Sequence, residues 1–383
     1  MQGLAIMGFI ITGMQVNFFM NPKHFSFLQI CTILMLSIGM MNHVIVIPVL
    51  MEVAGRDAWI SVLLASILFV PVFFLIAYII QKTMSAQHRS IIEWLREKYG
   101  KWVAGCIAVV LSLTLFTSAL FTGKDFKIWT SSSYLPETPP SVIAIILVGV
   151  AYYISLQGIR AIAYSSAVLL PLVIIFGEFV MISNYPHKDY AMLFPVFEYG
   201  KSQAINGILF VGTGFIEVMY IIFLQQHIRA KVKKRHVVIL GLMMAGLTIG
   251  PVMGSIAAFG PVEAQIQRYP AFEEWRLVKI GNYIEHVDFL SIYQWVCGAF
   301  IRISLAMYMI GELIPKWKKL VSSLIALLMA ILLVSEIGDI TFLYVMKTYY
   351  FPITFYTLLG MLLVLFLFVL FAKRDEVKKI NES

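Results

Sequence analysis

The sequence of 383 residues contains little charge, because Asp, Glu, Lys and Arg together make up only 13% of it. In soluble domains about a quarter of the residues are charged, so this composition excludes an ordinary soluble globular protein. Hydrophobic residues account for 60% of the chain. The main solvent of such a chain is lipid.

Cysteine is also scarce, and the three residues present, Cys31, Cys106 and Cys297, each lie within an apolar run. Their spacing is unlike that of metal ligands, so we interpret them as small core residues. The sequence lacks an HExxH motif, a phosphate-binding loop and a nucleophile elbow. We therefore expect no enzyme activity, no metal site and no cofactor.

Long apolar runs are what the sequence does contain. A helix needs roughly 20 apolar residues to cross a bilayer core. The runs predict an all-α polytopic membrane protein with about ten transmembrane helices. The expected crossings are 26–50, 57–81, 102–123, 139–159, 162–183, 204–226, 236–260, 286–311, 318–335 and 348–372.

The basic residues indicate the orientation of the chain. Lys and Arg gather after crossings two, six and eight and at the C-terminus, and cytoplasmic loops retain positive charge. We expect residues 1–25 to form a cytoplasmic N-terminal segment, 26–372 a single transmembrane domain and 373–383 a cytoplasmic tail. The net charge of +8 follows from this topology, and its dispersal over several loops argues against a nucleic-acid partner.

Residues 1–19 are mostly apolar but have neither a basic n-region nor a small-residue cleavage site. They match a signal peptide poorly. Two interpretations remain, a weakly amphipathic extension or a true start at Met20, and the missing n-region favours Met20.

Two crossings contain residues that favour a break in the helix. The first reads LSIGMMNHVIVIP and the sixth reads GILFVGTGFIEVMY. Helix-breaking residues lie at matching positions of two halves, 26–183 and 204–372, and we expect the breaks around Gly39 and around Gly212 to Gly214. This pattern predicts an inverted five-plus-five repeat with a binding site at broken helices one and six. The alternative is that these glycines are close-packing points, which are common in membrane helices.

Glu217 is the most informative single residue, because a carboxylate at membrane depth is costly unless it is paired, protonated or wetted. Either it has a functional role, with Arg302 of crossing eight as its counter-ion, or it is a protonated side chain bonded to the freed backbone of its own helix. Asp125 is a second candidate charge. His43 is ordinarily a neutral core histidine, although its position also permits contact with a ligand, and Glu178 is near enough to the outer end of crossing five to reach water.

Four segments identify a family resemblance. They are FSFLQICTILMLSIG in the first crossing, AGRDAWIS at 54–61, LFPVFEYG at 193–200 and IEHVDFLSIYQW at 284–295. With them the chain resembles, over about residues 20–372, the B subunit of the spore germinant receptors. That family is similar to the amino-acid/polyamine/organocation transporters of LeuT-like fold.

The resemblance implies a nutrient-sensing subunit in the inner membrane of the bacterial spore. Its implied partners are a receptor A subunit, a C-subunit lipoprotein and a small nutrient such as an amino acid, and its implied role is to trigger germination. The alternative is a proton-coupled amino-acid permease in which Glu217 or Asp125 carries the proton. We expect the ligand to bind between crossings one, three, six and eight, and the candidate lining residues are Gly39, Met40, Asn42, Phe116, Leu120, Phe210, Gly212, Gly214, Glu217 and Tyr308.

Overall fold

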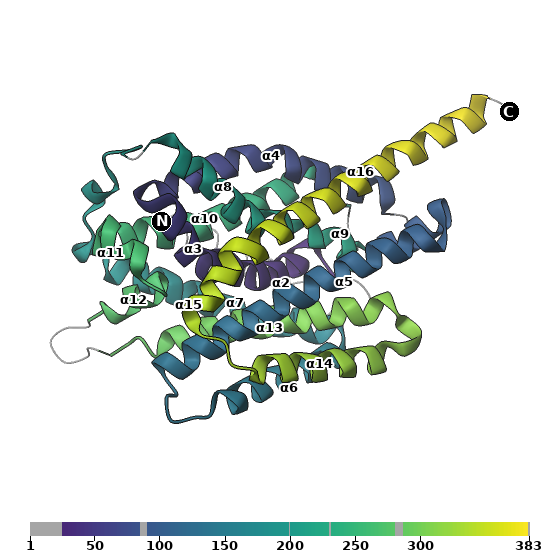
Figure 1. Cartoon of the computed structure of the whole chain (residues 1–383). Helices are drawn as coiled ribbons and strands as arrows, with labels where there is room; N and C mark the ends of the chain where they lie inside the picture. Colours follow the sequence, from purple (N-terminus) through teal and green to yellow (C-terminus); the bar gives the residue numbers. More distant parts are fainter. Residues whose placement is uncertain (1–24, 85–89, 199, 230, 280–285, 382–383) are drawn as a thin grey trace.

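The computed structural model describes residues 25–84, 90–198, 200–229, 231–279 and 286–381. Within them the chain is almost entirely helical, and the one β-bridge joins Phe25 to Ile228. The prediction of an all-α protein is confirmed (Figure 1). The expected start at Met20 and the apolar stretch 1–19 lie outside the described residues.

The described residues contain nine stretches that are long and apolar enough to cross a membrane. The first stretch, Phe27–Thr83, has 57 residues. At 1.5 Å per residue it would far exceed a hydrocarbon core of about 30 Å. It turns at Gly55, where φ is 57°, and therefore supplies two crossings, which brings the total to the ten expected.

The helices follow one another along the chain with short connections. Their bounds are α2 (Phe27–Met40), α3 (Val46–Ala54), α4 (Ala58–Thr83), α5 (Ile91–Ser133), α6 (Pro140–Gln157), α7 (Ile159–Ser183), α8 (Lys201–Ile216), α9 (Tyr220–Leu224), α10 (Lys234–Phe259), α11 (Pro261–Ile266), α12 (Pro270–Arg276), α13 (Leu290–Leu313), α14 (Lys318–Val334), α15 (Asp339–Val345) and α16 (Phe351–Asn381).

The third crossing is longer than its apolar run. A capping box between Ser90 and Glu93 begins α5. Gly100, with φ of 87°, separates a short first helix from the crossing itself. The helix then continues to Ser133 instead of ending near 123, so Asp125, which we expected just beyond the crossing, lies inside it.

The first and sixth crossings are irregular, but not at the glycines. In crossing one a π-helical turn, Met41–Ile45, joins α2 to α3, and Gly39 lies in regular α-helix. In crossing six a 3₁₀ turn, Glu217–Met219, joins α8 to α9. Gly212 and Gly214 are in the regular part of α8, so the prediction of breaks at the glycines was wrong.

The most deeply buried helices of the bundle are those of crossings one, six and eight. α4 packs against α8 and α10, and α13 packs against α2, α5 and α6. In Figure 1, α6 and α14 lie together at one edge, and the C-terminal turns of α16 reach beyond the other helices. The first and sixth crossings are thereby enclosed by their neighbours.

Two of the segments that carry the family resemblance contact each other. The Asp57 carboxylate accepts hydrogen bonds from the Phe197 backbone N–H at 3.0 and 3.1 Å. Beside it, Arg56 forms an ion pair with Glu198 at 2.6 Å. The turn between crossings one and two is thus bound to the loop that precedes crossing six.

The orientation of the bundle remains a prediction that labelling can test. Val262 in α11 and Trp317 before α14 are 75% and 54% exposed. In a chain whose exposed Cys106 is replaced by serine, we expect a membrane-impermeant maleimide to label Val262→Cys on intact cells and Trp317→Cys only after permeabilisation. The opposite pattern would reverse the topology.

Candidate functional site

Arg302 is the centre of a buried polar network, which we call the Arg302 junction. Its guanidinium pairs with both oxygens of Glu217, at 2.5 and 2.7 Å. It also donates to the Ser37 carbonyl at 2.9 Å, to Ser118 Oγ at 2.5 Å and to Thr122 Oγ1 at 3.0 Å. The junction consists of these five residues.

The junction connects four crossings that are far apart in the sequence. Ser37 belongs to α2, Ser118 and Thr122 to α5, Glu217 to the 3₁₀ turn of crossing six and Arg302 to α13. A guanidinium has five N–H donors, and these contacts use all of them. The structure thus contains the Glu217–Arg302 pairing, not a glutamate bonded to its own helix.

Asn42 lies beside the junction in the π-helical turn. Its side chain is fully buried, and within the described part of the chain neither its Oδ1 nor its Nδ2 has a hydrogen-bond partner. It packs against Gly214, where an added Cβ would lie 1.8 Å from Asn42 Oδ1. Gly214 is therefore required because crossings one and six approach each other closely.

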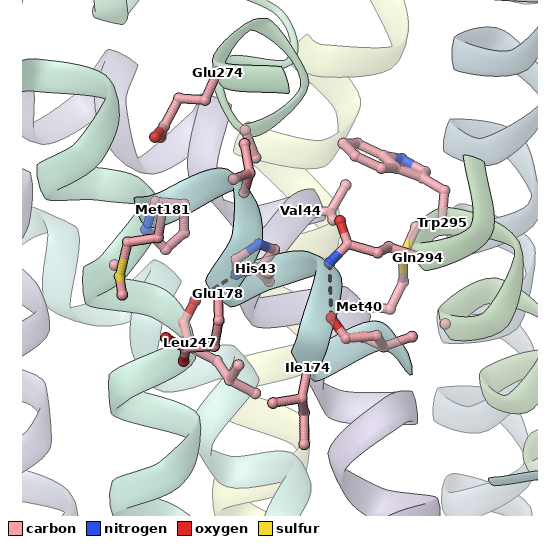
Figure 2. Close-up of a pocket in the computed structure, with 18 of the residues that line it drawn as sticks. Met40, His43, Val44, Ile174, Glu178, Met181, Leu247, Glu274, Gln294 and Trp295 are labelled. Atoms are coloured by element: carbon pink, nitrogen blue, oxygen red, sulfur yellow. Dashed lines mark hydrogen bonds between the residues drawn. The ribbon is translucent and has the colours of Figure 1, made fainter. Parts of the chain in front are cut away.

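A cavity of about 210 Å³ lies on the other side of crossing one. Figure 2 shows its lining residues converging from several helices. Crossings one, five, seven and eight and helix α12 contribute to it. The lining includes Met35, Leu36, Gly39, Met40, His43, Val44, Val173, Ile174, Glu178, Met181, Lys188, Leu247, Gly250, Glu274, Trp275, Gln294, Trp295 and Gly298.

One end of the cavity is closed by a buried ion pair. Lys188 Nζ lies 2.6 Å from Glu274 Oε2, and the two side chains are 2% and 6% exposed. Ser255 donates to the other oxygen of Glu274 at 3.1 Å. Burial raises the pKa of the Glu274 carboxyl, and Lys188 and Ser255 oppose that rise.

The structure divides the predicted lining residues between several places. Gly39 and Met40 line the cavity, whereas Asn42, Gly214 and Glu217 are at or beside the junction. Phe210 packs on Phe351, and Gly212 is close to Phe69 and Phe355. Phe116 and Leu120 pack on the core, and Tyr308 bonds His227 at 3.0 Å beside a smaller cavity of about 80 Å³. The cavity is therefore bordered by crossings one, five, seven and eight, not by one, three, six and eight.

Asp125 has a different partner from its neighbour Lys124. Its carboxylate pairs with Arg268 at 2.7 Å, and Arg268 also bonds Asp339 at 2.9 Å. Lys124 donates to the Leu332 carbonyl at the end of α14. Asp125 thus connects crossing three to the segment between α11 and α12.

Sequence reasoning missed Lys188 and Glu274. Both lie outside the apolar runs, where charged residues are common and give no signal of burial. Trp295 was part of a segment that carried the resemblance but was given no role. His43 and Glu178, which we had considered as weaker candidates, both line the cavity.

Comparison with known proteins relates the chain to a family of membrane proteins. A sequence family described as "Spore germination protein" matches residues 22–339. Spore germination protein XB of Bacillus anthracis is 38% identical over 355 residues, covering 92% of this chain and 99% of that protein. Spore germination protein KB of Bacillus subtilis (strain 168) is 22% identical over 264 residues, covering 67% and 69%.

A solved structure shows the fold. The crystal structure of MhsT in complex with L-phenylalanine, a LeuT-fold protein, superposes with a TM-score of 0.63 at 12% identity, covering 88% of this chain and 89% of MhsT. The ten crossings with irregular helices one and six therefore form a LeuT-like bundle. With a family match over most of its length and a close relative along nearly all of it, the chain belongs to the spore germination protein family.

Proposed function

We propose that the chain is the nutrient-sensing subunit of a spore germinant receptor, located in the spore inner membrane, and that a small nutrient binds in the cavity beside crossing one. The supporting observation is the position of crossing one. Its Gly39, Met40 and His43 line the cavity, while its Ser37 carbonyl bonds Arg302. The same helix thus contacts both the ligand space and the junction.

This arrangement provides a route from binding to a change in the bundle. A ligand shifts a conformational equilibrium only by its different affinity for the two states. The π-helical turn Met41–Ile45 is the kind of helix irregularity that often occurs at functional sites. A shift of crossing one moves the Ser37 carbonyl relative to Arg302, and crossings three, six and eight respond together.

The proposed partners are a receptor A subunit and a C-subunit lipoprotein. They would respond to the conformation of the bundle through contacts with its surfaces outside the cavity. The family membership supports such an assembly, since the relatives are described as germination proteins. Co-purification of the tagged chain from spores, followed by identification of the bound subunits, tests it.

A proton-coupled amino-acid permease is the second candidate, favoured by the likeness to MhsT crystallised with L-phenylalanine. In that case Glu217 or Asp125 would carry the proton, although each already pairs with an arginine. Uptake of labelled amino acids into proteoliposomes under a proton gradient distinguishes the two. Genomic neighbours encoding A- and C-type subunits would favour the receptor.

Filling the cavity tests the proposed site. Gly250 of α10 lines it, and a Cβ at Gly250 would meet nothing within 4 Å. We expect Gly250→Leu to accumulate normally, because leucine is a better helix former than glycine, and to lower the response to a nutrient mixture of amino acids, inosine and glucose by at least about 10-fold, since a cavity filled by a side chain excludes the ligand. Release of dipicolinic acid from spores measures the response.

Gly149→Leu is the matched control, because Gly149 is equally open but lies on α6 away from the cavity. It should respond like the parent protein. A normal response of Gly250→Leu would exclude the cavity as the nutrient site.

A further inference from the structure

The ionisable residues that line the cavity do not balance in charge. They are His43, Glu178, Lys188 and Glu274. Lys188 and Glu274 neutralise each other through their 2.6 Å contact. With a neutral imidazole at His43, the lining therefore has one surplus negative charge, that of Glu178.

The Glu178 carboxylate has no ion pair or hydrogen bond within the part of the chain that the structure describes. It is on α7, five residues before the helix ends at Ser183. Its side chain is exposed and also lines the cavity, so the protein leaves this carboxylate unpaired at the edge of the space where a ligand would lie. A ligand with a positive charge would pair with it.

His43 offers a second acceptor to the same space. Its Nδ1 is 2.9 Å from the Leu247 carbonyl oxygen. A carbonyl only accepts, so Nδ1 bears the proton, and Nε2 of the neutral ring is left with a lone pair. Figure 2 shows His43 near the middle of the pocket, Glu178 below it and Glu274 at the upper end.

The remaining lining is mostly apolar, and the described part of it lacks a free cation for a ligand carboxylate. Lys188 is held by Glu274, which also accepts from Ser255. Met40, Ile174 and Trp295 present hydrocarbon and an indole ring to the cavity. The volume of about 210 Å³ admits several water molecules or a small organic ligand.

From these features we infer that the cavity binds a small organic monocation, a protonated amine with an apolar body. The ammonium group donates to the Glu178 carboxylate and to His43 Nε2, and the apolar body packs against Met40, Ile174 and Trp295. This inference rests on the proposed function and specifies the charge of the ligand at the same site.

Three matched probes test it on the purified full-length chain in lipid nanodiscs. Phenethylammonium, L-phenylalanine and 2-phenylethanol share one apolar body and differ in charge. By isothermal titration we expect phenethylammonium to bind at least about 10-fold more tightly than either of the others, because charged hydrogen bonds contribute more than neutral ones.

Glu178 variants then locate the charge. Glu178→Gln should weaken phenethylammonium binding at least about 10-fold, since the amide keeps the size and loses the charge. Glu178→Asp should retain part of the binding. Glu137→Gln, at an exposed carboxylate in the loop between α5 and α6, should bind like the parent protein, and Gly250→Leu should not bind.

Each contrary result overturns the inference. Equal binding of 2-phenylethanol would show an apolar cavity without charge selection. Equal or tighter binding of L-phenylalanine would show a zwitterion site, and absent amine binding to a folded parent chain would remove the site. If Glu178→Gln or Gly250→Leu bound the amine as tightly as the parent chain, the amine site would lie outside this cavity. These binding experiments are independent of the nutrient response of spores, which tests the proposed function.

Discussion

Arg302→Met is expected to reduce the amount of folded protein in the membrane severely. The substitution leaves the fully buried Glu217 carboxylate without its partner and removes every bond of the junction. Breaking a buried ion pair by deleting one member costs roughly 3–5 kcal/mol, a large part of the roughly 5–15 kcal/mol that stabilises a typical protein. Immunoblots of membranes and thermal melting of the purified chain measure the loss.

Two variants serve as controls for this result. Arg160→Met removes an exposed arginine and should leave the level unchanged. The double variant Arg302→Met with Glu217→Leu removes both charges, so it should recover part of the loss, because an apolar pair of similar volume often replaces a buried ion pair. A normal level and melting temperature for Arg302→Met alone would contradict this account of the junction.

Glu217→Gln follows from the same geometry. The sequence alone left two interpretations of Glu217, a functional carboxylate with Arg302 as its counter-ion or a protonated side chain bonded to its own broken helix, and glutamine would have been tolerated in the second. Since the carboxylate pairs with Arg302 through both oxygens, glutamine leaves the guanidinium charge uncompensated. We therefore expect Glu217→Gln, like Glu217→Ala, to lower the amount of folded protein in the membrane, which immunoblots of membranes measure.

Gly214→Ala is the second substitution with a large expected effect. The added Cβ would lie 1.8 Å from Asn42 Oδ1 and 2.7 Å from Asn42 Cγ. Both residues are buried, so crossings one and six have to separate or the asparagine has to change rotamer. Overpacking of this kind typically costs about 1–3 kcal/mol, and we expect a lower melting temperature and a weaker nutrient response.

The compensating change is Asn42→Ala, which removes the side chain that the new methyl group meets. Gly214→Ala with Asn42→Ala should recover the melting temperature beyond the single Gly214→Ala. Gly149→Ala, where a Cβ meets nothing within 4 Å, should be neutral. If Gly214→Ala melts like the parent protein, the close approach of the two crossings is not as described.

The sequence was sufficient to predict the bundle, because run length alone decides whether a helix can cross a bilayer. The sequence predicted the ends of the crossings less well. Crossing three continues to Ser133 because Asp125 and Lys124 find buried partners, and charges that find partners do not end a helix. Such partners, Arg268 and the end of α14, are distant in the sequence and are not visible in it.

The irregular helices were assigned to the right crossings, but the irregular turns do not lie at Gly39, Gly212 or Gly214. Gly212 and Gly214 are small because Phe69, Phe355 and Asn42 pack against them, which is the close-packing alternative. The 3₁₀ turn begins instead at Glu217. A glycine that allows close approach and a glycine that unwinds a helix have the same sequence signal.

The Glu217–Arg302 pair was one of the two interpretations drawn from the sequence, since intramembrane charges need partners and few are available. The cavity was not predictable. Its walls on α7 and α10 come from helices that are apolar on every side, so their sequences do not fix which face turns inward. Gly39 and Met40 were identified, and the residues across the cavity from them were missed.

The order of the junction residues in the sequence determines when the Arg302 junction can form during synthesis. A chain emerges from the ribosome N-terminus first, so Ser37, Ser118, Thr122 and Glu217 are all synthesised before Arg302. Until crossing eight arrives, the Glu217 carboxylate in the nascent bundle has to remain hydrated or protonated. Insertion of crossing eight is then the step that completes the junction, and nascent chains that stop short of it would lack the arginine that neutralises their core.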